Sequence, residues 1–149
     1  MVSAENVQLA TRIMDGLPLD DLGEAFGDPE RIAAMGASLE PLVDPDLEVV
    51  AVGPEYTGEG TVHRGLTGYL EFWVDWLEPW ESFRIEAQEY LDAGDKVVML
   101  ARQVGTTETG GVPVDSLGAA VMTFEAGRVT RIEFHLDRDR AMKAAGLAE

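Results

Sequence analysis

Residues 83–136 read FRIEAQEYLDAGDKVVMLARQVGTTETGGVPVDSLGAAVMTFEAGRVTRIEFHL. Apolar, β-branched and aromatic residues recur along this stretch with a period close to two, which is typical of half-buried strands. Short turns that contain glycine interrupt the pattern at residues 93–95, 110–111 and 126–127. The stretch therefore predicts an antiparallel meander with strands at Phe83–Leu91, Lys96–Thr107, Val112–Phe124 and Val129–Leu136.

Helical patterns lie on both sides of this meander. Asp28 followed by Pro29 has the form of an N-cap with proline at the first helical position. Apolar spacing and capping together predict helices at about 5–17, 29–39 and 66–80, a helical stretch that includes Leu22 and Phe26, and a short helix after Asp137, with an extended run at 47–52. Helices followed by a run of strands predict an α+β fold, in which a curved sheet packed on the N-terminal helices encloses a cavity.

The composition excludes several classes of function. The chain has 149 residues, which fits a single domain spanning 1–149. It has 28 acidic against 11 basic residues and a net charge of −17, which repels nucleic acid. Without cysteine, and with two histidines, it offers no usual metal site, so we expect no metal. We see no signal peptide or membrane-spanning stretch and expect a cytoplasmic protein without membrane partners.

Short motifs accompany this order of elements, at residues 44–48 (DPDLE), 63–65 (HRG), 92–98 (DAGDKVV), 127–129 (GRV) and 136–138 (LDR). With them, nearly the whole chain resembles the SnoaL-like (polyketide cyclase-like) proteins of the nuclear transport factor 2-like superfamily. The resemblance implies a cone-shaped fold with a deep cavity and a homodimer that pairs through the outer sheet face. Members of the superfamily include ketosteroid isomerases, polyketide cyclases, an epoxide hydrolase, dehydratases and non-catalytic binding domains, so the fold alone does not identify a reaction.

The resemblance also implies which side chains face the cavity. Matching the strand at 112–124 to the isomerases and cyclases puts Ala120 where they carry a cavity acid, with Met122 facing the same way. The same matching turns Leu100, Arg102 and Phe134 inward and leaves residues 131, 133 and 135 on the outer surface. The positions of the isomerase base, the cyclase acid and the epoxide hydrolase acid then hold residues that cannot transfer a proton: Val50 or Ala51, Ala120 and Phe134.

Arg102 is the main charged candidate that remains. On an inward face it needs an anion or several acceptors, because an unpaired buried charge is costly. One interpretation is a structural ion pair with Asp115 or a helix acid. The other is a clamp for a ligand carboxylate, enolate or carbonyl. Asp115 has outward parity, but a bulge near Pro113 would turn it toward the cavity.

The remaining candidates surround the expected cavity. His63 lies beside a loop at the cavity mouth and can exchange protons near neutral pH, although an exposed or strand-bound histidine is the structural alternative. Tyr56 can donate its hydroxyl to a ligand carbonyl or pack over the core. Trp73 and Trp76 belong to an apolar helix face, and with Leu100, Ala120, Met122 and Phe134 they predict an apolar pocket for a small hydrophobic molecule.

Three hypotheses of function follow. The first is a cofactor-free enzyme of the cyclase, isomerase or hydrolase type, with Arg102 stabilising an enolate and His63 or Tyr56 exchanging the proton. The second is a small-molecule binding domain that has kept the cavity without the acids. The third is a dimerising interaction module whose cavity is filled by side chains. None of them requires a cofactor, and we expect none.

Overall fold

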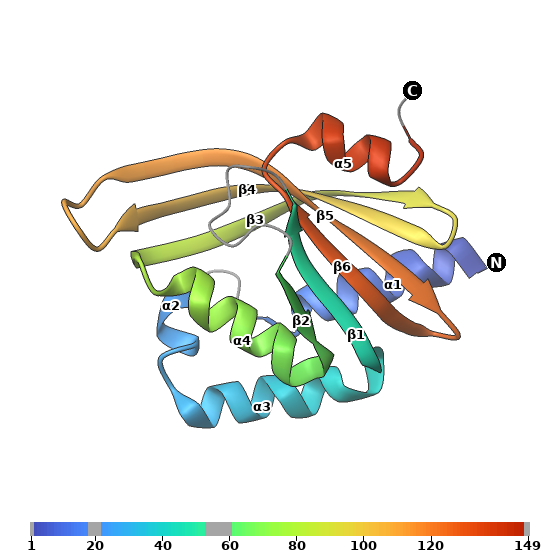
Figure 1. Cartoon of the computed structure of the whole chain (residues 1–149), viewed down its shortest axis with the longest axis horizontal. Helices are drawn as coiled ribbons and strands as arrows, with labels where there is room; N and C mark the ends of the chain where they lie inside the picture. Colours follow the sequence, from blue (N-terminus) through green and yellow to red (C-terminus); the bar gives the residue numbers. More distant parts are fainter. Residues whose placement is uncertain (1, 18–21, 53–60, 148–149) are drawn as a thin grey trace.

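The computed structural model describes residues 2–17, 22–52 and 61–147. Within them, the strands form one six-stranded sheet in the order β2-β1-β6-β5-β4-β3. The strands are β1 (Val43–Val52), β2 (Val62–Arg64), β3 (Trp80–Ala93), β4 (Lys96–Thr107), β5 (Pro113–Glu125) and β6 (Arg128–His135). β3 to β6 form the predicted antiparallel meander, and β1 joins it by running parallel to β6 (Figure 1).

The turns of the meander have the backbone conformation that their residues favour. Gly94 and Gly127 have φ values of 81° and 80°, a region that glycine enters without steric cost. β1 begins four residues and β3 three residues before the predicted start, so Trp80 begins β3 and does not end the preceding helix. The bounds of β5 and β6 differ from the predicted ones by one residue, within the usual uncertainty of strand ends. The three-residue strand β2 was not predicted, because Val62–Arg64 is too short to show a period.

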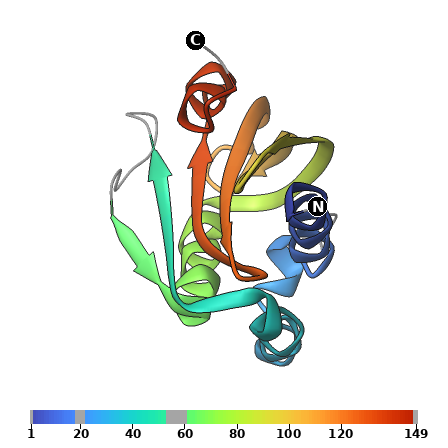
Figure 2. The ribbon, with the colours of Figure 1, turned by 90° about the vertical axis from the view of Figure 1, so that its right-hand side faces the viewer.

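The helices α1 (Val2–Asp15), α2 (Leu22–Ala25), α3 (Pro29–Leu39) and α4 (Gly65–Leu77) lie on one side of the curved sheet (Figures 1 and 2). A short 3-10 turn, Glu40–Leu42, leads from α3 into β1. Asp28 caps α3 as predicted, since its side chain accepts a hydrogen bond from the Glu30 amide at 3.0 Å. The apolar faces of these helices and the inner sheet face form the main core. The predicted α+β fold is therefore confirmed.

A fifth helix, α5 (Arg138–Ala144), packs on the opposite, outer face of the sheet (Figure 1). Asp137 caps it by accepting a hydrogen bond from the Arg140 amide. The Arg138 guanidinium donates to the Ala101 carbonyl at 2.8 Å and to Gln88 Oε1 at 2.6 Å. Gln88 lies at a bulge of β3, between Ala87 and Glu89. Arg138 therefore fixes the start of α5 to the middle of the sheet.

The observed register confirms the predicted orientation of β5 and β6 but reverses that of β4. Ala120 and Phe134 belong to the inner core, as predicted. Ala120 is paired with Met99, and directly opposed residues on antiparallel strands share a face. The inner face of β4 is therefore made by Val97, Met99, Ala101 and Gln103, so Leu100 and Arg102 lie on the outer face. Family matching placed β4 out of phase by one residue, and a shift of one residue inverts every side chain.

No helix among the described residues is long and apolar enough to cross a membrane. In the same part of the chain, histidine and carboxylate side chains form no group of three or more that would hold a metal ion.

Candidate functional site

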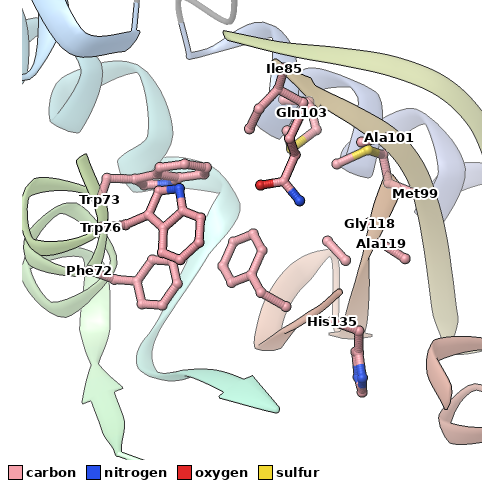
Figure 3. Close-up of a pocket in the computed structure, with 13 residues that line it drawn as sticks. Phe72, Trp73, Trp76, Ile85, Met99, Ala101, Gln103, Gly118, Ala119 and His135 are labelled. Carbon is pink, nitrogen blue, oxygen red and sulfur yellow. The ribbon is translucent and has the colours of Figure 1, made fainter. Parts of the chain in front are cut away.

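A small cavity of about 30 Å³ lies between α4 and the inner face of the sheet (Figure 3). The helices line it with Met14, Phe72, Trp73 and Trp76. The strands contribute Ile85, Met99, Ala101, Gln103, Ala120 and Phe134. Of the predicted binding residues, Trp73, Trp76, Ala120 and Phe134 thus line one cavity. Its apolar walls match the predicted type of pocket, whereas its volume suffices for one or two water molecules.

Aromatic rings form the helical wall of this cavity. Phe72 stacks on Phe134 with ring centroids 4.8 Å apart and an angle of 8° between the ring planes. Trp73 meets Phe134 edge to face, with ring centroids 5.6 Å apart. These rings come from α4 and β6, so the contact also joins the helix to the centre of the sheet. The wall is consequently rigid, apolar and suited to a flat molecule.

The indole N–H of Trp73 is a buried hydrogen-bond donor at this wall. Only 2% of Trp73 is exposed, and Nε1 forms no close hydrogen bond with the described residues. The hydroxyl of Tyr69, one turn earlier on α4, interacts with Trp73 through a weak side-chain hydrogen bond, which lowers the pKa of Tyr69. Burial has the larger effect and raises the pKa of Tyr69 to about 12. The Tyr69 hydroxyl is therefore the neighbouring acceptor for the Trp73 N–H, although the pair lies outside the distance and angle of a well-formed hydrogen bond.

Gln103 is the polar residue on the opposite wall, and the sequence analysis missed it. Its carboxamide extends from β4 toward Trp73 and Trp76 (Figure 3). A Cβ atom on Gly118 would lie 2.5 Å from Gln103 Nε2, so the absence of a side chain on Gly118 makes room for this amide. Pairing β4 with β5 through Ala120 and Met99 would have predicted that Gln103 faces inward.

Arg102 and Asp115 do not contribute to the cavity. On the outer face, the Arg102 guanidinium binds both carboxylate oxygens of Asp115, and its Nε–Oδ1 distance is 2.8 Å. Arg102 also lies 3.4 Å from Glu86 Oε2, with 41% of its side chain exposed. The hydrogen bond to Asp115 raises the pKa of Arg102, and the same bond lowers the pKa of Asp115. The prediction of an inward-facing Arg102 is wrong, and the alternative of an ion pair with Asp115 is confirmed.

The other predicted site residues also lie apart from the cavity. Leu100 packs beneath α5 on the outer face, because the observed register of β4 is opposite to the predicted one. Met122 is buried in the inner core but does not line the cavity. His63 lies on β2, where its ring meets Phe72 edge to face at 5.8 Å, so Phe72 separates it from the cavity. Tyr56 lies outside the described residues.

A chain of charged groups crosses the outer face over β1 and β6. Glu48 binds Arg64 at 3.1 Å and Arg131 at 2.8 Å, and Arg131 binds Glu133 at 2.8 Å. Glu133 in turn lies 3.1 Å from His135 Nε2. The hydrogen bond from His135, more than that from Arg131, lowers the pKa of Glu133 to about 2. Residues 131, 133 and 135 face outward as predicted, but only 2% of His135 is exposed, because its own chain covers it.

The cavity can bind an uncharged molecule but offers little for acid–base chemistry. None of the described lining residues is a carboxylate or a cation, and the His135 ring points away from the cavity centre (Figure 3). Proton transfer needs an ionisable group within hydrogen-bond reach of the substrate. Besides His135, the described lining residues carry as polar side-chain groups the indole N–H of Trp73 and of Trp76 and the Gln103 amide, and none of these three ionises near neutral pH.

Solved structures with the same fold are similar to this chain at low sequence identity. One is from Jannaschia sp. and bears the provisional name SnoaL-like polyketide cyclase; it has 18% identity, a TM-score of 0.67 and coverage of 99% of this chain and 95% of its own. A nuclear transport factor 2-like protein from Burkholderia thailandensis has 21% identity, a TM-score of 0.64 and 95% coverage of both chains. TerC, co-crystallised with polyporic acid, has 21% identity and a TM-score of 0.60, and the match covers 91% of this chain and 98% of TerC.

Among curated proteins, no sequence matches this chain. The model of the SnoaL-like domain family matches residues 27–132, which include the candidate cavity except for Met14, Phe134 and His135. The fold, with helices beneath a curved sheet, is also that of nuclear transport factor 2-like proteins. The family match covers more than half of the chain, and the chain therefore belongs to the SnoaL-like domain family.

Proposed function

We propose that the protein binds a small hydrophobic molecule in the cavity between α4 and the sheet. The observation that carries this proposal is the ring-lined wall made by Phe72, Trp73 and Phe134, which faces a space closed on its other side by small residues such as Ala101 and Ala120. Such a combination of aromatic wall and small opposite residues is typical of pockets for flat apolar ligands. The co-crystallisation of TerC with polyporic acid supports the idea that this fold accepts organic molecules.

A ligand larger than water requires the cavity to expand. Two of the lining side chains, Met14 and Met99, are flexible and carry no group that forms a strong hydrogen bond. Methionine is unbranched and fills irregular space in several rotamers, so it adapts to an occupant at little cost. We therefore expect the wall of rings to remain in place while these side chains repack around the ligand.

Binding without turnover is the version of this function that the geometry favours. Of the four candidates for catalysis, Arg102, Asp115 and His63 lie away from the cavity. The fourth, Tyr56, lies outside the described residues. A cofactor-free isomerase or cyclase mechanism would have to draw its proton-transfer group from elsewhere in the chain. Ala120, at the position that the resemblance matches to the cavity acid of the cyclases, lines the cavity but has no ionisable group.

The small size of the cavity favours a second candidate function. With about 30 Å³ of free volume, the interior is nearly filled by its own side chains. A chain of this kind can serve as an interaction module that pairs with a second copy through the outer sheet face. Beyond α5, that face carries the exposed Leu117 and the ion pair of Arg102 and Asp115.

Titration with N-phenyl-1-naphthylamine, a neutral dye that fluoresces in apolar pockets, separates these candidates. We expect saturable binding to the wild type and loss of binding in Ala120→Leu, which fills the cavity. Leu117→Phe adds bulk to the exposed outer face of the same strand and serves as the matched control. No saturable binding by the folded protein, together with a stable dimer in sedimentation velocity, would favour the interaction module instead.

A further inference from the structure

The helix α5 and the cavity lie on opposite faces of the same part of the sheet (Figure 1). Ala119 belongs to the small apolar cluster beneath α5 and also lines the cavity. On β4, Val98 and Leu100 pack toward α5, whereas Met99, between them, lines the cavity. A single layer of sheet therefore separates the helix from the cavity, and a movement of this layer changes the surroundings of both.

Arg138 holds α5 to this layer through polar contacts. Its guanidinium donates to the Ala101 carbonyl at 2.8 Å, and its Nε lies 3.4 Å from the Gly118 carbonyl. Both Ala101 and Gly118 line the cavity. The same guanidinium donates to Gln88 Oε1 at 2.6 Å, at the bulge of β3, and a bulge bends its strand. Arg138 thus connects α5 to β3, β4 and β5, three of the strands that line the cavity.

Apart from these contacts, α5 is held weakly. The helix has 7 residues, which is fewer than a helix needs to persist in isolation. Within Arg138–Ala144, Ala141 is the buried residue, so the apolar contact with the sheet is small. Arg138 lies in the first turn, where the positive end of the helix dipole disfavours a cation, so its position serves the contact with the sheet. An element of this kind opens at a low free energy while the rest of the domain stays folded.

The cavity must enlarge to hold an organic molecule, because about 30 Å³ suffices for one or two water molecules. The rings of Phe72, Trp73 and Phe134 pack on one another, so this side resists displacement. The opposite wall consists of small residues of β4 and β5, such as Ala101 and Ala119. Outward movement of this wall enlarges the cavity, and the docked α5 with its Arg138 contacts opposes that movement.

We propose that α5 is a latch on the cavity: docked through Arg138, it holds β4 and β5 close to α4, and its release lets these strands move outward and admit a ligand. This inference rests on the proposed function, since it concerns the regulation of the same cavity. Coupling between two events is reciprocal. Undocking of α5 therefore raises the affinity for a ligand, and a bound ligand loosens α5.

Two variants undock α5 by different means. Arg138→Met removes the guanidinium and keeps an unbranched stem, and Ala141→Asp places a charge in the fully buried contact beneath the helix. Lys143→Met is the matched control, because it removes the same charge from an exposed position of the same helix. In titrations with N-phenyl-1-naphthylamine, we expect both undocked variants to bind about five- to tenfold more tightly than the wild type. Lys143→Met should bind like the wild type.

Hydrogen exchange measures the latch by a second route. The α5 amides of the wild type are expected to exchange several-fold faster when the probe is bound. Without probe, the indole N–H of the buried Trp73 should exchange faster in Arg138→Met than in the wild type or Lys143→Met. Trp73→Phe identifies this resonance. Urea unfolding of each variant gives its global stability, and an increase in exchange counts as opening where it exceeds the factor that the loss of global stability predicts.

The outcomes separate the latch from the binding function. Tighter binding of the probe by both undocked variants, together with faster exchange of α5 in the complex, would support the latch. Equal affinity in all four proteins, with unchanged exchange of α5, would overturn the latch and leave the binding function in place. Failure of the folded wild type and of all three variants to bind the probe would overturn the binding function, and the latch would lose its role with it.

Discussion

The amide of Gln103 lies in the space that a side chain on Gly118 would occupy, with Nε2 2.5 Å from the position of the missing Cβ. The two residues are on neighbouring strands, β4 and β5, and both line the cavity. The shape of this part of the cavity is therefore determined by a pair of residues rather than by either one.

Gly118→Ala is expected to displace the Gln103 amide and to lower the free energy of unfolding by about 1–2 kcal/mol, the usual cost of overpacking. Gln103→Ala removes the colliding group, so the double variant should recover part of this loss. Urea unfolding of the four proteins in a double-mutant cycle measures the coupling. Additive effects of the two substitutions would show that the amide does not occupy this space.

Arg102→Met is expected to leave ligand binding in the cavity unchanged, because Arg102 binds Asp115 on the outer face of the sheet. An exposed ion pair contributes little to stability, so the urea midpoint should change only slightly, and less at 1 M salt than at low salt. Asp115→Asn serves as the partner control and should behave alike. A large loss of probe affinity in Arg102→Met alone would contradict the outward placement.

Glu133→Gln is expected to make stability less dependent on pH in acid. The hydrogen bond from His135 lowers the pKa of Glu133 to about 2 from an ordinary value of 4.5. Its contribution is therefore present above about pH 4.5 and is lost as the pH falls toward 2. After allowance for partial exposure of the pair, we expect it to amount to about 2 kcal/mol.

The measurement is the free energy of unfolding in urea between pH 7 and pH 2.5 for wild type and variant. Glu133→Gln should be less stable than the wild type at pH 7, and the difference should shrink toward pH 2.5. Glu81→Gln, at an exposed carboxylate of β3, is the control and should run parallel to the wild type. A constant difference at all pH values would contradict the lowered pKa.

Tyr69→Phe is expected to flatten the loss of stability in alkali. Burial raises the pKa of Tyr69 to about 12 in the folded chain, whereas an unfolded tyrosine ionises near 10. Stability that is fully present below pH 10 is then lost as the pH rises toward 12, by about 2–3 kcal/mol. Unfolding in urea from pH 8 to 11.5 measures it, and Tyr90→Phe, at a half-buried tyrosine with a raised pKa, should flatten the loss less.

Much of the fold could be predicted from the sequence because its signals are local. The turns at Gly94 and Gly127 and the caps Asp28 and Asp137 all act within a few residues, and each appears where it was predicted. The face of β4 could not be obtained in this way. Apolar residues occur at both parities of this strand, since Val97 and Met99 pack inward while Val98 and Leu100 pack beneath α5.

The same reversal explains which parts of the site were missed. A strand covered on both faces carries no alternation of hydrophobicity from which its inward side can be recognised. Arg102 therefore appeared as the cavity residue, whereas its neighbour Gln103 holds that position. On α4 and β6, where one side is clearly apolar, Trp73, Trp76 and Phe134 were predicted correctly as cavity residues.

The parallel pairing of β1 with β6 has a consequence for how the chain folds. It joins positions such as Glu48 and Arg131, which are 83 residues apart in the sequence. Contacts of such long range form late, because a large loop must close before they contribute. During synthesis, the β1–β2 hairpin must therefore wait for the last strand of the meander before it has a sheet to join. Truncation before Arg128 would leave that hairpin and β5 as two unpaired edges, and such edges favour aggregation over refolding.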